Sequence, residues 1–354
     1  MQQKKALIAM SGGVDSSVAA FLTAQEGYSC VGGTMLLYDF GDVCGSSAAI
    51  GDAQAVAQRL DMPFHVFPLM EQFRKCVIDD FVACYEKGLT PNPCIRCNRH
   101  MKFSAFLENA KELGCHCMVT GHYARIRRDE ATGRYLLCKA ADSAKDQSYF
   151  LYAITQEQLA RIRFPLGELT KDQVRVIATE QGFLNAKKRD SQDICFVPDG
   201  DYFAFLRRFT GKTYAPGDFL DASGKKVGTH QGAVAYTLGQ RKGLGLAMGQ
   251  PVYVCGKDME RNTVTVSTED ALFHKELLAN DWFFFPFDQL TQPLRVEAKT
   301  RSRMAQQPAT VYPESDGTCR VVFDQPQRAI TPGQAVVLYD GDIVVGGGTI
   351  TKVV

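Results

Sequence analysis

Short apolar runs alternate with amphipathic segments over the first part of the chain. Residues 6–10, 28–37 and 63–67 are apolar runs with the length of buried parallel strands. Residues 50–60 and 71–87 repeat apolar side chains at helical spacing. This alternation predicts an α/β fold with a doubly wound parallel sheet covered by helices.

A different pattern begins near residue 211, where glycine becomes frequent and β-branched residues alternate with polar ones. Residues 211–266 predict a small, mainly β module. Residues 282–354 predict short strands joined by turns, which is typical of a small antiparallel β-barrel. The chain of 354 residues is also too long for one ordinary core. We therefore predict three domains, at residues 1–208, 209–280 and 281–354.

Composition narrows the class of protein. Apolar residues make up 45% of the chain, which favours packed domains over disorder. The net charge is only +1, so any contact with nucleic acid must come from a local basic surface. The sequence contains no apolar run long enough to cross a membrane and no signal-peptide pattern. We therefore expect a cytoplasmic protein with no membrane contact.

The segment after the first predicted strand has the features of an anion-binding loop. Ser11, Gly12 and Gly13 break the apolar run, and a helix is predicted from Ser16 onward. Such a turn directs backbone N–H groups at an anion, and glycine lets a phosphate approach closely. Asp15 would repel a phosphate unless a metal cation lay between them. The loop lacks the lysine of a Walker A motif, so it predicts a nucleotide whose pyrophosphate leaves; a plain turn is the alternative.

Two further positions suit a nucleotide. Met35 lies near the end of a predicted strand, and Gly121 directly follows another. In a doubly wound sheet, ligands bind at the carboxyl ends of the strands. Both residues are therefore candidates for contacts to the nucleotide.

Twelve cysteines in a cytoplasmic chain indicate thiol or metal chemistry at a few sites rather than a disulfide scaffold. Cys94 and Cys97 have the spacing shared by metal sites, iron–sulfur clusters and redox disulfides. We expect a helix over residues 98–109 with Cys97 at or near its start. The helix dipole there, together with the nearby Arg96, Arg99 and Lys102, would lower the thiol pKa from about 8.5. A zinc site would need further ligands, for which residues 115–117 are the candidates.

Basic and polar segments provide candidate RNA contacts. Lys145 suits an RNA phosphate and Gln147 a base or sugar, although a helix start followed by buried aromatic residues is the alternative. Residues 169–188 predict a helix with a basic end, which is either a solvated face or a phosphate-contacting surface. Residues 237–245 form a basic, glycine-rich loop suited to a phosphate backbone.

Six motifs occur in order along nearly the whole chain: SGGVDSS, NPCIRCN, VTGHYAR, KDQSYFLY, SQDICFV and LGQRKGLG. Together they resemble the tRNA-specific 2-thiouridylases of the pyrophosphate-loop ATPase superfamily, which thiolate the wobble uridine of certain tRNAs. The resemblance implies adenylation of the uridine C2 oxygen with ATP and Mg²⁺, then sulfur transfer from a cysteine persulfide or a cluster-bound sulfide. Another AMP-forming ligase of the superfamily, another RNA sulfurtransferase and a non-enzymatic RNA-binding module are the alternatives.

The resemblance also implies roles for individual residues. Cys97 would be the nucleophile and Cys195 the carrier of the persulfide, with a disulfide between them after turnover. The residues implied in ATP binding are Ala9, Met10, Ser11, Gly12, Gly13, Val14, Asp15, Ser16, Met35 and Gly121. The residues implied in tRNA binding are Asn92, Pro93 and Cys94, at the target base, and Lys145, Asp146, Gln147, Arg301 and Ser302.

Cys94 departs from the family pattern, because many members have aspartate there, where it is taken as an acid/base aid. The change makes Cys94 a third catalytic candidate, and with Cys97 and Cys195 it offers three thiolates that could hold a [4Fe–4S] cluster. Other tRNA thiolases use such an arrangement, so the cluster and persulfide routes both stay open. The resemblance further implies a sulfur-donor partner, either a cysteine desulfurase or a relay protein, and we expect a monomer.

Overall fold

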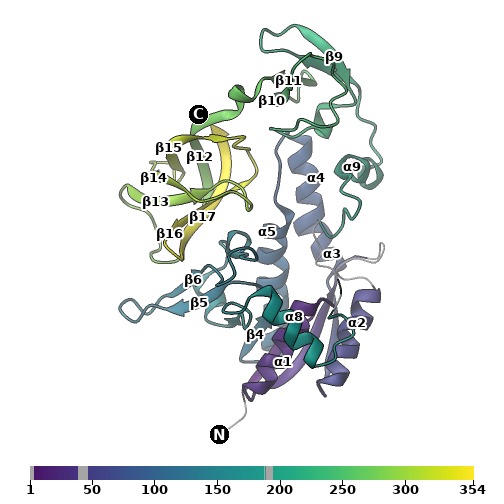
Figure 1. Cartoon of the computed structure of the whole chain (residues 1–354), viewed down its shortest axis with the longest axis vertical. Helices are drawn as coiled ribbons and strands as arrows, with labels where there is room; N and C mark the ends of the chain where they lie inside the picture. The colour runs from purple at the N-terminus through teal and green to yellow at the C-terminus, as the bar shows by residue number, and fades with distance from the viewer. Residues whose placement is uncertain (1–3, 39–46, 187, 189–193) are drawn as a thin grey trace.

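The computed structural model describes residues 4–38, 47–186, 188 and 194–354. Its N-terminal part is a sheet flanked by helices, among them α1, α2 and α8 (Figure 1). The sheet has five strands in the order β3-β2-β1-β4-β7. Its strands are β1 (Lys5–Ala9), β2 (Ser29–Leu36), β3 (Phe64–Pro68), β4 (Cys117–Thr120) and β7 (Ile162–Arg163). All neighbouring strands run parallel, which confirms the predicted α/β domain.

Helices cover both faces of this sheet, because successive strand residues point to opposite faces. Ala6 and Ile8 of β1 pack in one core with α1 (Val14–Gln25), α2 (Ser47–Arg59) and α8 (Lys171–Glu180). Leu7, between them, packs in a second core with the helices of residues 93–112. All three β1 side chains are fully buried, which explains the uninterrupted apolar run in the sequence.

Two long helical runs each contain a π-helical stretch. The first comprises α3 (Met70–Phe73), η1 (Arg74–Ile78) and α4 (Asp79–Glu86), and the second comprises α5 (Pro93–Cys97), η2 (Asn98–Ala105) and α6 (Phe106–Glu112). The second run was predicted to start at residue 98, which is wrong. It starts at Pro93 because proline suits the first helical position and the Asn92 side chain accepts a hydrogen bond from the Ile95 N–H at 3.4 Å.

The helix predicted over residues 169–188 is shorter in the structure. α8 begins after Thr170, whose hydroxyl accepts a hydrogen bond from the Gln173 N–H at 3.3 Å within a capping box. It ends at Glu180, shortly before Gly182, which has a φ of +62°. The predicted extension beyond Glu180 is therefore wrong; residue 187 lies outside the described part of the chain.

A second sheet follows α9 (Tyr202–Thr210) and confirms the predicted small β module. Its strand order is β10-β11-β8-β9. The strands are β8 (Gly217–Leu220), β9 (Lys226–His230), β10 (Tyr253–Asp258) and β11 (Thr263–Ser267), with the 3₁₀ helices η4 (Ala233–Ala235) and η5 (Glu269–Leu272) beside them. The domain boundary expected between residues 208 and 209 falls inside α9.

The last six strands form a closed antiparallel barrel around an apolar core, as predicted. They are β12 (Phe273–Phe284), β13 (Leu294–Lys299), β14 (Gln307–Pro313), β15 (Cys319–Arg328), β16 (Ala335–Asp340) and β17 (Ile343–Val353). Pairing of β12 with β17 closes the barrel. The boundary expected between residues 280 and 281 falls inside β12.

The first domain and the barrel share a sheet edge. The hairpin of β5 (Arg125–Arg128) and β6 (Tyr135–Cys138) belongs to the first domain and pairs with β17 through Cys138 and Ile343. Two short helices, η3 (Ser148–Phe150) and α7 (Gln156–Leu159), follow this hairpin. Among the residues that the structure describes, no helix is both long and apolar enough to cross a lipid bilayer.

Candidate nucleotide and thiol site

The glycine loop after β1 has a conformation that few other residues would tolerate. Gly12 has a φ of +72°, and a Cβ built on it would lie 2.4 Å from the Ala49 carbonyl oxygen of α2. Gly13 is the N-cap of α1 and carries no such restriction, because the nearest atom to its hypothetical Cβ is the Ser11 Oγ at 3.5 Å. Gly12 therefore lets the loop pass tightly beneath α2.

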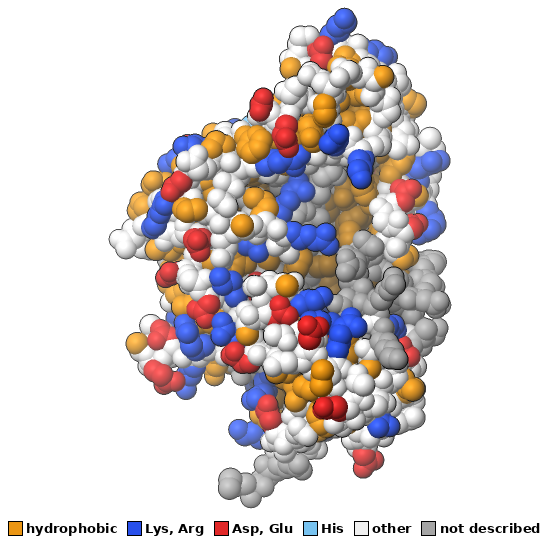
Figure 2. All heavy atoms as spheres, in the orientation of Figure 1, with side chains coloured by type: hydrophobic (Ala, Val, Ile, Leu, Met, Phe, Trp, Pro, Cys, Tyr) orange, Lys and Arg blue, Asp and Glu red, His pale blue; other side chains and the backbone are white. Residues whose placement is uncertain are grey.

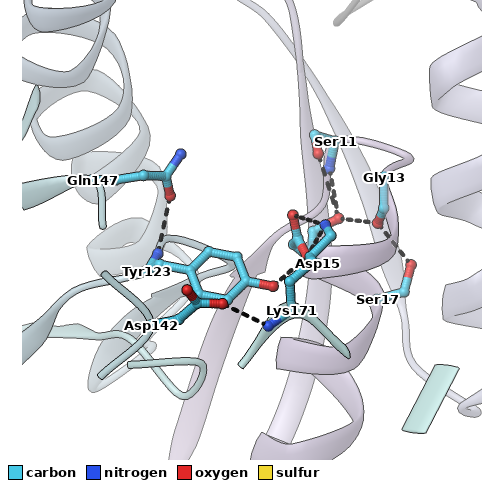
Figure 3. Close-up of polar contacts among 9 residues, drawn as sticks. Ser11, Gly13, Asp15, Ser17, Tyr123, Asp142, Gln147 and Lys171 are labelled. Carbon is cyan, nitrogen blue, oxygen red and sulfur yellow. Dashed lines mark hydrogen bonds and ion pairs between the residues drawn. The ribbon is translucent and has the colours of Figure 1, made fainter. Parts of the chain in front are cut away.

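Serine side chains tie this loop to the first turn of α1 (Figure 3). The hydroxyls of Ser16 and Ser17 both donate to the Gly13 carbonyl, at 3.0 and 3.1 Å. The Ser11 N–H donates to the Ser16 Oγ at 3.2 Å. The loop is thus held in shape by the chain itself, with the helix N-terminus facing it, as an anion-binding loop requires.

The predicted nucleotide residues converge at the carboxyl ends of neighbouring strands. Gly121 follows β4, and a Cβ on it would lie 2.7 Å from both the Asp15 carbonyl carbon and the Ser16 nitrogen. Met10, after β1, is buried and its N–H donates to the Gly33 carbonyl of β2 at 2.8 Å. Met35 lies near the end of β2. This edge is where a doubly wound sheet binds its ligand.

Lys171, which is distant in sequence, lies beside Asp15 and forms an ion pair with it. Its Nζ lies 2.7 and 2.9 Å from the two carboxylate oxygens of Asp15, and the Tyr123 hydroxyl donates to the same carboxylate at 2.8 Å (Figure 3). The Lys171 side chain is only 8% exposed, whereas that of Asp15 is 30% exposed. Lys171 therefore compensates the charge of Asp15 within the chain, and the metal cation expected between Asp15 and a phosphate stays a prediction.

Sequence reasoning placed Lys171 on a basic helix face and missed this role. One signal was available, because Lys171 is the first residue of α8, where a positive charge opposes the helix dipole. Its backbone N–H is satisfied by the Asp142 carboxylate at 2.9 Å. A cation at this unfavourable position indicates a partner elsewhere in the fold.

Two of the three catalytic cysteine candidates pack against one apolar cluster. Cys97 ends α5, and Cys195 lies in the segment before α9; both are partly buried. Each contacts the cluster built around Phe73, Phe81 and Phe196. The Tyr38 hydroxyl, just beyond β2, donates a hydrogen bond to the Cys195 carbonyl. The fold thus brings two thiols that are distant in sequence to the same cluster.

The expected position of Cys97 at the helix start is wrong. It is the fifth residue of the helical run, and the exposed Cys94 is the one in the first turn, nearer the positive end of the dipole. Nearby cations also have anionic partners: Arg96 Nε lies 3.2 Å from Asp80, and Arg99 pairs with Asp281. The lowered pKa of the Cys97 thiol stays a prediction.

Metal-ligating side chains are not gathered within the described residues. No group of three or more Cys, His, Asp or Glu side chains there is arranged to hold a metal ion. Cys94, Cys97 and Cys195 therefore do not form a cluster site as placed. Cys115 and Cys117, the candidates for a zinc site, are buried thiols whose pKa values are raised by desolvation.

Two neighbouring residues among the predicted RNA contacts, Asp146 and Gln147, make hydrogen bonds within the first domain. The Asp146 carboxylate accepts from the Ala140 N–H at 3.0 Å and from the Ser148 hydroxyl at 2.8 Å. The Gln147 side-chain oxygen accepts from the Tyr123 N–H at 2.9 Å (Figure 3). Asp146 and Gln147 thus shape the turn before η3, and their predicted contact with RNA stays a prediction, as does that of the half-buried Lys145 and Ser302.

Basic side chains border the hollow between the first domain and the two β modules on the face that Figure 2 shows. His122, after β4, is neutral at physiological pH, because burial and the charge of Lys102 hold its pKa well below the usual value. The Lys102 Nζ lies 3.5 Å from the His122 Nε2. The overall charge of the chain is nearly balanced, so this local surface is the candidate for binding a polyanion.

A parallel sheet with a glycine loop after its first strand defines a nucleotide-binding domain of the HUP type. Residues 4–199 match the family model described as the tRNA methyl transferase HUP domain. Residues 204–268 match the tRNA methyl transferase PRC-barrel domain, and residues 274–350 match the aminomethyltransferase beta-barrel domain.

Full-length relatives identify the family more closely. The chain is 48% identical to the tRNA-specific 2-thiouridylase MnmA of Clostridioides difficile, over 99% of this chain and 98% of that protein. It is 49% identical to the protein of the same name from Acetivibrio thermocellus, over 99% of this chain and all of that protein. The chain therefore belongs to the family of tRNA-specific 2-thiouridylases. A solved 4-thiouridine synthetase–RNA complex with bound ATP covers 58% of this chain and 50% of its own, at 17% identity and a TM-score of 0.36.

Proposed function

We propose that this chain replaces the C2 oxygen of the wobble uridine of tRNA with sulfur, at the expense of ATP. One observation carries the proposal beyond family membership. Met35, near the end of β2 and next to the strand that bears the glycine loop, packs against the same apolar cluster as Cys97 and Cys195. Met35 therefore connects the edge of the sheet where we expect the nucleotide with the cluster that contacts both thiols.

The first step would activate a poor leaving group. The uridine C2 oxygen attacks the α-phosphorus of ATP, the bond from that phosphorus to the bridging oxygen breaks, and pyrophosphate leaves. Backbone N–H groups of the glycine loop and the Lys171 ammonium would stabilise the charge on the departing pyrophosphate. Mg²⁺ would arrive with the phosphates of ATP. Because Lys171 already neutralises Asp15, that carboxylate need not repel the nucleotide.

The second step would transfer sulfur. A persulfide on Cys195 attacks C2 through its terminal sulfur, and the bond from C2 to the AMP-bearing oxygen breaks, releasing AMP. The Cys97 thiolate then attacks the Cys195 Sγ, and the electrons of the broken S–S bond complete the new thiocarbonyl. The product is a Cys97–Cys195 disulfide, which a thiol reductant returns to two thiols. A cysteine desulfurase or a relay protein would supply the next sulfur in the cytoplasm.

Reconstitution tests this proposal. Purified protein, ATP, unmodified tRNA and a cysteine desulfurase with free cysteine, whose persulfide passes its outer sulfur to the Cys195 thiolate, should yield 2-thiouridine, detected by mass spectrometry of the nucleosides. Cys97→Ser should abolish thiolation and leave ATP binding unchanged, whereas Cys255→Ser, in the central sheet, should retain thiolation. Asp15→Ala should lose adenylation and keep tRNA binding. ATP turnover without any thiolated product would contradict the proposal.

The same preparation separates the two sulfur routes. The cysteines as placed do not assemble a cluster site in the described residues, so the steps above use the persulfide alone. Protein purified anaerobically should be colourless and free of iron, and should still thiolate tRNA. Activity that depends on bound iron would overturn the persulfide route.

A further inference from the structure

The guanidinium of Arg301 lies at the junction of the barrel and the central module. Arg301 is in the turn after β13 and is half-buried. Its Nη2 donates to the Thr331 hydroxyl at 2.8 Å, to the Ala329 carbonyl at 3.2 Å and to the Leu238 carbonyl at 3.3 Å. Leu238 belongs to the basic loop of residues 237–245, so this side chain joins two domains.

The basic loop lies directly against the barrel at this point. Gly239 has a φ of +84°, and a Cβ on it would lie 2.8 Å from the Ala329 Cβ. Ala329 itself has a φ of +52°, a conformation that alanine rarely adopts. Its N–H donates to the Leu272 carbonyl at 2.8 Å. The surroundings therefore enforce this strained turn, and the Arg301 side chain is part of what enforces it.

The same barrel segment also holds the chain that leads into the cysteine helix. The Thr90 N–H donates to the Pro332 carbonyl at 2.9 Å. The Gln334 side-chain amide donates to the Thr90 carbonyl at 2.9 Å, and a Cβ on Gly333 would lie 2.9 Å from the Thr90 nitrogen. The helix that carries Cys94 and Cys97 starts at Pro93, three residues after Thr90. Residues 329–334 thus contact the segment that precedes the cysteine helix on one side and the basic loop on the other.

We propose that Arg301 is a positioning residue that fixes the basic loop of residues 237–245 and the segment leading into the cysteine helix in one relative placement. This inference rests on the proposed function, because the purpose we assign to Arg301 is to hold two segments that face tRNA at a constant spacing. All three acceptors face the Nη2 of a rigid, planar group, which fixes their relative placement, whereas a lysine ammonium on a flexible stem is a point charge. Direct contact of Arg301 with tRNA phosphate is the competing role.

Arg301→Lys separates these two roles because it keeps the charge and loses the fork. Arg303→Lys is the matched control, since Arg303 is an exposed arginine in the same turn. Hydrogen exchange of the free protein should rise about tenfold in both residues 237–240 and residues 88–92 of Arg301→Lys, through local opening, and stay unchanged in Arg303→Lys. The affinity for tRNA should fall about tenfold in Arg301→Lys alone, as expected for loss of hydrogen bonds to a charged group.

Wild-type exchange in both segments of Arg301→Lys would overturn the inference, and so would opening of only one segment. Retained tRNA affinity would also overturn it and assign Arg301 to a phosphate contact. If Arg301→Lys does not fold, Thr331→Val removes a single acceptor and should open the same two segments. The exchange measurement needs neither ATP nor thiolation, so failure of the proposed function leaves it unaffected.

Discussion

Removal of the Lys171 ammonium is the sharpest test of the nucleotide site. Lys171→Met keeps the length and apolar stem of the side chain and deletes its charge. The Asp15 carboxylate then keeps the Tyr123 hydroxyl at 2.8 Å but loses both ion-pair contacts, at 2.7 and 2.9 Å. A carboxylate would remain unpaired beside the loop that must receive a triphosphate.

The magnitude of the effect follows from burial. Leaving one charge of a buried pair uncompensated costs about 3–5 kcal/mol. The Asp15 side chain is 30% exposed, so water offsets part of this cost, and we expect a loss of about 2–3 kcal/mol in the free energy of unfolding. Pyrophosphate release should slow by about 10²-fold, the size of effect found when one preorganised donor to a developing charge is deleted.

Lys188→Met is the matched control for this change. Lys188 also forms a 2.7 Å ion pair, with Asp52, but both side chains are close to half exposed. Its loss should cost less than about 1 kcal/mol and leave pyrophosphate release unchanged. Urea unfolding gives the stability, and a coupled assay at saturating ATP gives the rate. Equal destabilisation by the two substitutions, or release at the wild-type rate in Lys171→Met, would refute the reasoning.

Two other predictions concern the loop and the central module. Gly12→Ala should weaken ATP binding in isothermal titration and lower the free energy of unfolding in urea by about 2 kcal/mol or more, because its Cβ would meet the Ala49 carbonyl at 2.4 Å and its φ is positive. Gly13→Ala should change both quantities by much less, because its Cβ would make only an ordinary contact of 3.5 Å with the Ser11 Oγ. Burial lowers the pKa of Lys257, whose Nζ donates to the Tyr236 carbonyl at 2.8 Å, from 10.5 to about 8. Between these values the unfolded chain binds the proton that the folded chain has released, so stability should rise with pH by up to about 1.4 kcal/mol per unit. In Lys257→Met the contribution of this lysine to the rise in stability should vanish. A pH dependence of unfolding that is the same as in the wild type would contradict the prediction.

Local patterns in the sequence were sufficient for the parallel sheet, the glycine loop and the barrel. The three consecutive buried residues of β1 and the glycine at positive φ leave direct signatures, because both depend only on neighbours in the chain. The start of the cysteine helix was also encoded locally, in Asn92 and Pro93. The helix was nevertheless predicted to start at residue 98, although proline suits a first helical turn and asparagine suits the cap before it.

Tertiary structure alone decided which charges and segments meet. Lys171 reaches Asp15 across 156 residues of chain, and Arg301 reaches Leu238 across 63. The pairing of the β5–β6 hairpin with the barrel and the meeting of Cys97 and Cys195 at one cluster are of the same kind. Such contacts depend on how the domains pack, and the hydrophobic periodicity that predicts each element contains no information about its distant partner.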